Sequence, residues 1–393
     1  MDALTTPSNW QRVRLGDIAE INPPTIIPNV FYYIDLENVE KGQLLNKQLM
    51  TKNKAPSRAR RLLSKNDILY QLVRPYQRNN YFFTLNGNYV ASTGYAQIRT
   101  LQNPSFLYFA LHSNYFVNAV LDRCEGTSYP AISSNELKKC EVILPPLNEQ
   151  IAIANILSDV DHYLYSLDAL ILKKESVKKA LSFELLSQRK RLKGFNQNWQ
   201  RVRLGDIAEI KRGASPRPIE NPKWFCTNSN VGWVRISDIS KNSRFLYKTA
   251  QKLSKKGIEK SRFVKQNSLI MSMCAIIGKP IITKIDTCIH DGFVVFENPK
   301  IDLNYLYYFL CYIEKEWLES GQQGSQVNLN VDLIKNKEVF YPKDLNEQIA
   351  IANILSALDH EIISLKNKKR QFDNIKKALN HDLMSAKIRV LNK

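Results

Sequence analysis

Two segments of this chain occur twice, and this repetition constrains the fold more than any other sequence feature. Residues 9–21 and 198–210 share the same 13 residues, NWQRVRLGDIAEI. Residues 147–158 and 345–356 share the same 12 residues, LNEQIAIANILS. Matches of this length do not arise by chance, so the 393-residue chain consists of two halves built on one framework.

The stretches between the repeated blocks differ from each other. Residues 22–146 form an insert of 125 residues, residues 211–344 form one of 134, and the two show little identity. Each insert has short β-type runs broken by turn residues, followed by a helical stretch, which indicates an α+β domain. Two framework copies with unlike inserts predict a pseudo-two-fold axis within one chain, which presents two different surfaces to a two-fold partner.

The second repeated block begins a long amphipathic segment. From Leu147 to about Gln188, apolar residues recur at alternating spacings of four and three, and the pattern repeats after Leu345. This periodicity is typical of a coiled coil. If each helix packed only on its own domain, much of its apolar stripe would stay uncovered. We therefore expect an antiparallel helix pair between two α+β domains: domains at residues 1–146 and 196–344, helical spacers at 147–195 and 345–393.

The charge of the chain is strongly and unevenly positive. There are 56 Lys and Arg residues against 37 Asp and Glu, a net charge of +19. Residues 41–80 hold ten basic residues and one acidic residue, and residues 211–265 hold fourteen and three. All of the excess therefore lies in two windows, one per insert, whereas a charge kept for solubility would be spread out. Two basic platforms suit a long polyanion, and double-stranded DNA is the obvious candidate.

The residue types in these windows suit base reading, since Arg pairs with guanine and Asn or Gln with adenine in the major groove. Two polar loops before the long helices add further candidates. In the first insert the predicted DNA-binding residues are Arg58, Arg60, Arg61, Arg74, Tyr76, Gln77, Arg78, Asn79, Thr127 and Ser128. In the second they are Arg217, Lys223, Trp224, Arg244, Lys255, Lys256, Arg262, Gln323, Ser325 and Gln326.

Motifs for catalysis are lacking in the sequence. There is no GxxxxGK[ST] phosphate loop, and no glycine-rich loop follows a strand as in cofactor-binding domains. The six cysteines show no CxxC spacing, so we expect free thiols, no metal site and a cytoplasmic location. The longest apolar run is far shorter than the roughly 20 residues that span a bilayer.

At this point the chain resembles the specificity subunit of type I restriction–modification systems. The resemblance rests on W-x-x-V-x-L-G-D-I at residues 10–18 and 199–207, and on P-P-L-x-E-Q-x-x-I-A at residues 145–154. A second copy of the latter motif, at residues 345–352, follows Tyr-Pro-Lys-Asp instead of the double proline. The doubled framework with unlike inserts spans essentially the whole chain.

This resemblance implies a non-catalytic subunit with two target-recognition domains, each reading one half of a bipartite DNA site. It implies assembly with two modification subunits that carry an S-adenosylmethionine-dependent adenine methyltransferase, and optionally with two ATP- and Mg-dependent restriction subunits. No cofactor is expected in this chain and no membrane partner. The repeated helices are implied to dock the modification subunits, through Glu149, Gln150, Asn155, Glu347, Gln348 and Asn353.

Two other classes of protein stay open at this point. A coiled-coil scaffold that binds only proteins would leave the two basic windows unexplained, and it predicts no salt-dependent affinity for DNA. A self-contained DNA enzyme would keep its activity after a modification subunit is removed.

Overall fold

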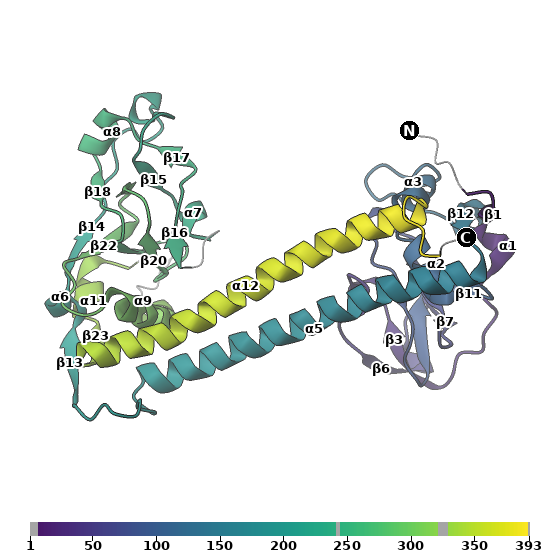
Figure 1. Cartoon of the computed structure of the whole chain (residues 1–393), viewed down its shortest axis with the longest axis horizontal. Helices are drawn as coiled ribbons and strands as arrows, with labels where there is room; N and C mark the ends of the chain where they lie inside the picture. Colours follow the sequence, from purple (N-terminus) through teal and green to yellow (C-terminus); the bar gives the residue numbers. More distant parts are fainter. Residues whose placement is uncertain (1–6, 241–243, 321–328, 392–393) are drawn as a thin grey trace. The chain divides into compact units, whose positions relative to one another are not determined.

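The computed structural model of the chain describes residues 7–240, 244–320 and 329–391. Its contacts group into two units (Figure 1). Unit 1 comprises Met1–Ala169 and Lys366–Lys393, and unit 2 comprises Leu170–Leu365. Each unit thus contains one insert and a part of both long helices. None of the described helices is both long and apolar enough to cross a membrane.

Two four-stranded sheets carry most of unit 1. Sheet 1a has the order β2 (Ala19–Ile21), β11 (Tyr95–Thr100), β8 (Ile68–Gln71) and β9 (Tyr81–Phe82). Sheet 1b has the order β6 (Gln48–Thr51), β3 (Val30–Ile34), β10 (Tyr89–Ser92) and β7 (Ala59–Leu62). Within these two sheets, neighbouring strands are antiparallel except for β3 and β10, which run parallel.

The first repeated block joins sheet 1a to the start of the long helix. Its strand β1 (Gln11–Arg14) pairs antiparallel with β12 (Glu141–Leu144), just before that helix. The short helix α1 (Leu15–Ile18) follows β1 and packs against α4 (Ser134–Lys139). The helices α2 (Pro104–Ala110) and α3 (Asn114–Leu121) complete the domain, and Trp10, Leu15, Phe106 and Ile153 share one buried core. Framework and insert therefore fold as one body.

Unit 2 is built in the same way. Sheet 2a has the order β14 (Glu209–Arg212), β22 (Phe293–Glu297), β19 (Leu269–Ser272), β20 (Pro280–Thr283) and β16 (Phe245–Leu246). Sheet 2b has the order β17 (Gln251–Lys252), β15 (Gly232–Val234), β21 (Thr287–Ile289) and β18 (Arg262–Val264). The framework pair is β13 (Trp199–Arg203) with β23 (Glu338–Pro342). The remaining helices are α6 (Leu204–Ile207), α7 (Ile236–Ser240), α8 (Lys255–Glu259), α9 (Leu303–Tyr312), α10 (Glu314–Ser320) and α11 (Val331–Asn336).

The two inserts share one topology although their sequences differ. Each first sheet pairs its strands in the same chain order, and unit 2 adds β16 at one edge. Each second sheet contains one parallel pair, β3 with β10 and β15 with β21. The backbone agrees even in detail: Arg74 and Ala275, in equivalent connections after β8 and β19, both have a left-handed conformation, with φ of 54° and 60°. Positions in one unit can therefore be matched to positions in the other.

Helices α5 (Leu147–Leu186) and α12 (Leu345–Met384) are 40 residues each. Within unit 1, Asp161 pairs with Lys376 and Asp168 pairs with Lys369, so the two helices run antiparallel there. Within unit 2, the pair of Lys178 with Asp359 is accompanied by an ion pair of Lys174 with Glu361, again antiparallel. In each helix, the second residue after the last helical residue has a left-handed backbone conformation. The chain turns back there, so that backbone N–H groups beyond the helix donate to carbonyl groups of its last turn.

The predicted fold class is confirmed: α+β domains, an internal repeat and two long antiparallel helices. Each contact unit includes segments of both long helices, and the domain boundaries given above stay a prediction. The helices begin at residues 147 and 345, as the repeated block predicts. Strands β10 and β11 are separated by a turn at Thr93 and Gly94, and this turn lies at the candidate site.

Candidate DNA interface

In unit 1, the turn between β10 and β11 brings two of the predicted basic loops together. Thr93 N donates to the carbonyl of Arg58 at 2.8 Å, in the loop before β7. Leu72 N donates to the carbonyl of Gly94 at 3.0 Å, at the end of β8. The loop with Arg58 and the loop with Arg74 are thus fastened to the two sides of one turn. We call this part of the molecule the turn end of unit 1.

A third predicted loop joins the same end through Arg74. The backbone N–H of Arg74 donates to the carbonyl of Pro130 at 2.7 Å. Its guanidinium lies 4.2 Å from the ring centre of Tyr129, a cation–π contact. Tyr129 and Tyr76 are 64% and 50% exposed, while Arg74 itself is partly buried, so this end presents two aromatic side chains at the surface. Thr127 and Ser128 are exposed in the same loop.

Arg58 is held in place while most of its guanidinium stays open. It forms an ion pair with Asp35 at 3.1 Å, and its side chain is 60% exposed. Arg60 is exposed, and its Nε donates to the carbonyl of Ser57 at 2.7 Å. Arg61 is partly buried, and this burial lowers the pKa of its guanidinium. Exposed arginines held by one contact each are suited to phosphate or base contacts.

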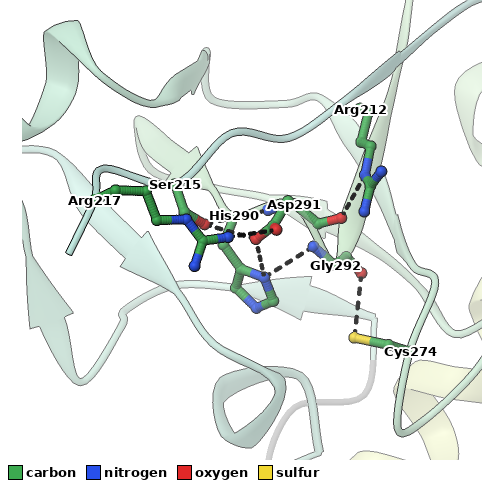
Figure 2. Close-up of polar contacts among 7 residues, drawn as sticks. All are labelled: Arg212, Ser215, Arg217, Cys274, His290, Asp291 and Gly292. Atoms are coloured by element: carbon green, nitrogen blue, oxygen red, sulfur yellow. Dashed lines mark hydrogen bonds and ion pairs between the residues drawn. The ribbon is translucent and has the colours of Figure 1, made fainter. Parts of the chain in front are cut away.

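The equivalent turn end of unit 2 is centred on His290, Asp291 and Gly292, between β21 and β22. Met273 N donates to the carbonyl of Gly292 at 2.8 Å, as Leu72 N does to Gly94 in unit 1. Figure 2 shows Arg217 and Arg212 on opposite sides of Asp291.

Both of those arginines contact Asp291. The terminal nitrogen of Arg217 lies 3.0 Å from Oδ2 of Asp291. Arg212 Nε donates to the backbone carbonyl of Asp291 at 2.8 Å, and Ser215 Oγ donates to Oδ1 at 2.7 Å (Figure 2). The hydrogen bond from Ser215, followed by the charges of Arg217 and His290, lowers the pKa of Asp291, which is ionised at neutral pH.

Two more basic residues belong to this end. Arg262 Nε donates to the carbonyl of Arg212 at 3.2 Å. Arg235 follows β15 and is close enough to His290 to lower the pKa of that imidazole, although burial of the ring is the larger cause. The turn end of unit 2 therefore carries four arginines, of which the first two contact Asp291: Arg212, Arg217, Arg235 and Arg262.

A second basic group in unit 2 forms around helix α8. Ser254 N and Oγ donate to the carbonyls of Trp224 and Lys223, at 2.8 and 2.7 Å. This fastens the segment with Lys223 beside Lys255 and Lys256, and all three lysines are exposed. Nζ of Lys223 lies 4.3 Å from the ring centre of Trp224.

Several predicted DNA-binding side chains are used inside the protein, and the prediction is corrected for them. Arg244 is buried, and its guanidinium donates to Tyr308, Asn304 and Ser356 at 3.0, 2.6 and 2.6 Å. Arg78 donates to the His112 carbonyl and to Asn114. Trp224 is buried in a small core, with its indole N–H on the Pro218 carbonyl.

Two further predicted residues also form hydrogen bonds within the protein but are less buried. Gln77 is exposed, and its amide oxygen accepts from Gln71. Asn79 is partly buried, and its amide oxygen accepts from Lys41 N. Three predicted residues lie outside the described part of the chain: Gln323, Ser325 and Gln326.

Four of the predicted docking residues are also buried. Glu149 accepts from Trp10 Nε1, and Glu347 accepts from Trp199 Nε1. The amide nitrogens of Gln150 and Gln348 donate to the carbonyls of Pro145 and Pro342. Their amide oxygens accept from the backbone N–H of the residue just before α2 and the residue just before α9. These side chains hold the framework together and do not reach a partner in this conformation. Asn155 and Asn353 are exposed, and their docking role stays a prediction.

Sequence reasoning missed part of the site in unit 2. Arg212, Ser215 and Asp291 were not singled out, because a single acidic residue after an apolar strand gives no signal by itself. The available signal was the position of Arg212, directly after the repeated block, in a segment that also contains Arg217.

Comparisons with known proteins point to one family. The type I restriction enzyme MjaVIII specificity subunit of Methanocaldococcus jannaschii is 25% identical over 428 residues, which cover 100% of this chain and 96% of that protein. The type I restriction–modification system S subunit from M. genitalium shares the fold, with a TM-score of 0.61, 17% identity, and coverage of 95% of this chain and 96% of that one.

A further chain comes from a structure described as the basis of complex assembly and conformational transition of the type I R-M system. It aligns with a TM-score of 0.60 and 21% identity, covering 96% of this chain and 98% of that one. The family described as "Type I restriction modification DNA specificity domain" matches residues 7–174 and 196–372. These two matches span most of the chain, which therefore belongs to the family of type I restriction–modification DNA specificity domains.

Proposed function

We propose that this chain is the non-catalytic subunit that selects the DNA target of a type I restriction–modification complex. Each turn end reads one half of a bipartite site. The observation that carries this proposal is that equivalent ends of two unlike inserts both carry arginines: the exposed Arg58 with the partly buried Arg74, and the exposed Arg212 with Arg217. A shared topology with different side chains is what two half-sites of different sequence require.

The same proposal includes docking of two modification subunits on the repeated helical block. In α5, Leu147, Ile151 and Asn155 are exposed and four residues apart, so they form one stripe on the helix surface. In α12, the identical stripe consists of Leu345, Ile349 and Asn353. Exposed apolar residues that recur in both copies suit two copies of one partner.

In this proposal the chemistry belongs to the partners. The modification subunits bring S-adenosylmethionine, restriction subunits bring ATP and Mg²⁺, and this chain contributes DNA affinity and orientation. The described residues contain no group of three or more His, Cys, Asp or Glu side chains placed to hold a metal ion.

The test is methylome sequencing of a host that expresses this chain together with its modification subunit. We expect methylated adenines in one split motif. A chimera in which residues 22–146 come from another family member should change one half of that motif and retain the other. A change in both halves would refute the assignment of one domain to one half-site.

A scaffold that binds only proteins makes the opposite prediction for DNA binding. Filter binding of the assembled complex should show an affinity that falls steeply with salt, since cationic contacts to phosphates release counterions. An absence of salt-dependent binding would overturn the proposed function.

A further inference from the structure

The contacts of Asp291 restrict how Arg217 can meet a ligand. Asp291 contacts one terminal nitrogen of Arg217, and among the described residues this is the only side-chain hydrogen bond of that guanidinium. The side chain of Arg217 is 69% exposed. Four of its five N–H groups are therefore available, including a pair that can donate in parallel.

Asp291 is itself held rigidly. Ser215 Oγ fixes Oδ1 of its carboxylate, and Arg212 Nε binds its backbone carbonyl (Figure 2). The backbone segments around Asp291 are closely packed, because a Cβ on Gly213 would come within 2.0 Å of the His290 carbonyl oxygen. A Cβ on Gly292 would lie 2.5 Å from the His290 ring. The carboxylate is thus a fixed support for the guanidinium rather than a mobile counterion.

The Asp291 carboxylate also favours one of the two DNA groups that arginine binds, a phosphate or a guanine edge, over the other. A phosphate placed on Arg217 would lie close to the charge of Asp291 and would be repelled. A guanine edge offers the neutral acceptors O6 and N7, which match two parallel N–H groups. Arg212 and Arg262 add positive charge on the same end for the phosphates. A guanidinium oriented by a fixed carboxylate is therefore better suited to a base than to the backbone.

We propose that Arg217 reads one guanine in the half-site of the second domain and that Asp291 is the positioning residue that aims it. This inference rests on the proposed function and deepens it. Ser215 supports Asp291 in the same way that Asp291 supports Arg217.

The test uses the complex of the full chain with its modification subunits. Binding selection from a pool of random duplexes first defines the bipartite motif for the wild type. Each base pair of the motif is then substituted in turn, and affinity is measured by fluorescence anisotropy for wild type, Arg217→Lys, Arg217→Ala and Asp291→Asn. Arg58→Ala, in the other unit, is the matched control.

We expect one guanine in one half-site whose substitution weakens wild-type binding by about 10- to 100-fold. Arg217→Lys and Arg217→Ala should abolish the penalty at that base pair and keep the penalties elsewhere. Asp291→Asn should reduce the same penalty and strengthen binding to unrelated DNA, because a negative charge is lost. Damage to the fold would instead weaken binding to every sequence. Arg58→Ala should lower the overall affinity but leave the substitution penalties within this half-site unchanged.

Other results would overturn the inference. A half-site without guanine, an unchanged substitution profile in the Arg217 variants, or a uniform loss of affinity with a lower salt slope would each contradict guanine reading. The last result would identify Arg217 as a phosphate contact. An Asp291→Asn profile identical to wild type would remove Asp291 from the site. If the wild type selects no sequence at all, the proposed function itself fails.

Discussion

Arg389 and Glu149 form a two-point ion pair in unit 1, with distances of 2.7 Å from Nε and 3.2 Å from a terminal nitrogen. The Glu149 carboxylate is only 3% exposed, and it also accepts the indole N–H of Trp10 at 2.9 Å. The segment after α12 is thereby tied to the start of α5 and to the first repeated block. A buried carboxylate of this kind is stable only while its donors stay in place.

Unit 2 repeats this arrangement with Arg191, which follows α5, and Glu347, at the start of α12. Their shortest distance is 2.8 Å, and Trp199 donates to the same carboxylate. The identical blocks therefore make equivalent buried polar contacts in both units, although the inserts differ.

Replacing Arg389 should destabilise unit 1. We expect Arg389→Ala to lower the free energy of unfolding by about 2–4 kcal/mol, because Glu149 stays buried with one donor fewer. Arg191→Ala should cost a similar amount in unit 2. Urea unfolding followed by tryptophan fluorescence measures both. Lys387→Ala, an exposed neighbour, is the control, and a stability of Arg389→Ala equal to that of Lys387→Ala would contradict the role of the ion pair.

The long helices were predictable because their signal is local. An apolar stripe at spacings of three and four, together with the repeated block, defines where α5 and α12 begin. The role of Glu149 was not predictable, because its donors lie 139 and 240 residues away in the sequence. Sequence alone does not distinguish a polar side chain at a helix N-terminus that docks a partner from one that, like Glu149, is buried by tertiary contacts.

The candidate site was predictable as two regions of charge, not as a set of side chains. Arg58 and Arg244 lie in equally basic windows, yet one is exposed and the other is enclosed by Tyr308 and its neighbours. The contact of Arg212 with Asp291 joins residues 79 positions apart and depends on the pairing of β14 with β22. The amino-acid composition does not reveal which strands pair, so this contact could not be predicted from it.

We expect replacement of Arg58 and replacement of Arg244 to have opposite effects on stability and DNA binding. Arg244→Ala should reduce the free energy of unfolding by about 2–3 kcal/mol, since Tyr308 and Asn304 each lose a buried guanidinium donor. Arg58→Ala should leave stability within about 0.5 kcal/mol and weaken DNA binding. Urea unfolding and salt-dependent anisotropy on the same preparations separate the two effects. A stable Arg244→Ala protein with poor DNA binding would restore the original prediction for Arg244.

His112 should make unit 1 sensitive to acid. Burial, and then the charges of Lys376 and Arg78, lower the pKa of His112 to about 4 from its usual 6.5. Between these values the unfolded chain binds a proton that the folded chain does not, so stability falls as the pH drops from about 6.5 to about 4.

The matching variant is His112→Gln. Wild type should lose about 2–3 kcal/mol more than this variant between pH 7 and pH 4. His360→Gln, at an exposed position on α12, serves as the control and should behave like wild type. Urea unfolding at both pH values gives the comparison, and parallel losses in wild type and His112→Gln would exclude His112 as the cause.

The repeated stripe on the long helices predicts the stoichiometry of assembly. Ile151 and Ile349 occupy the same position in the two copies, and they are 43% and 38% exposed. If each stripe docks one modification subunit, Ile151→Asp or Ile349→Asp should release one copy, and the double variant should release both, because a charge would be buried in an apolar contact. Native mass spectrometry of the purified complex counts the subunits. Tyr165→Asp, exposed on α5 outside the repeated block, is the control and should retain two. Loss of both subunits from a single variant would mean that the two stripes do not act independently.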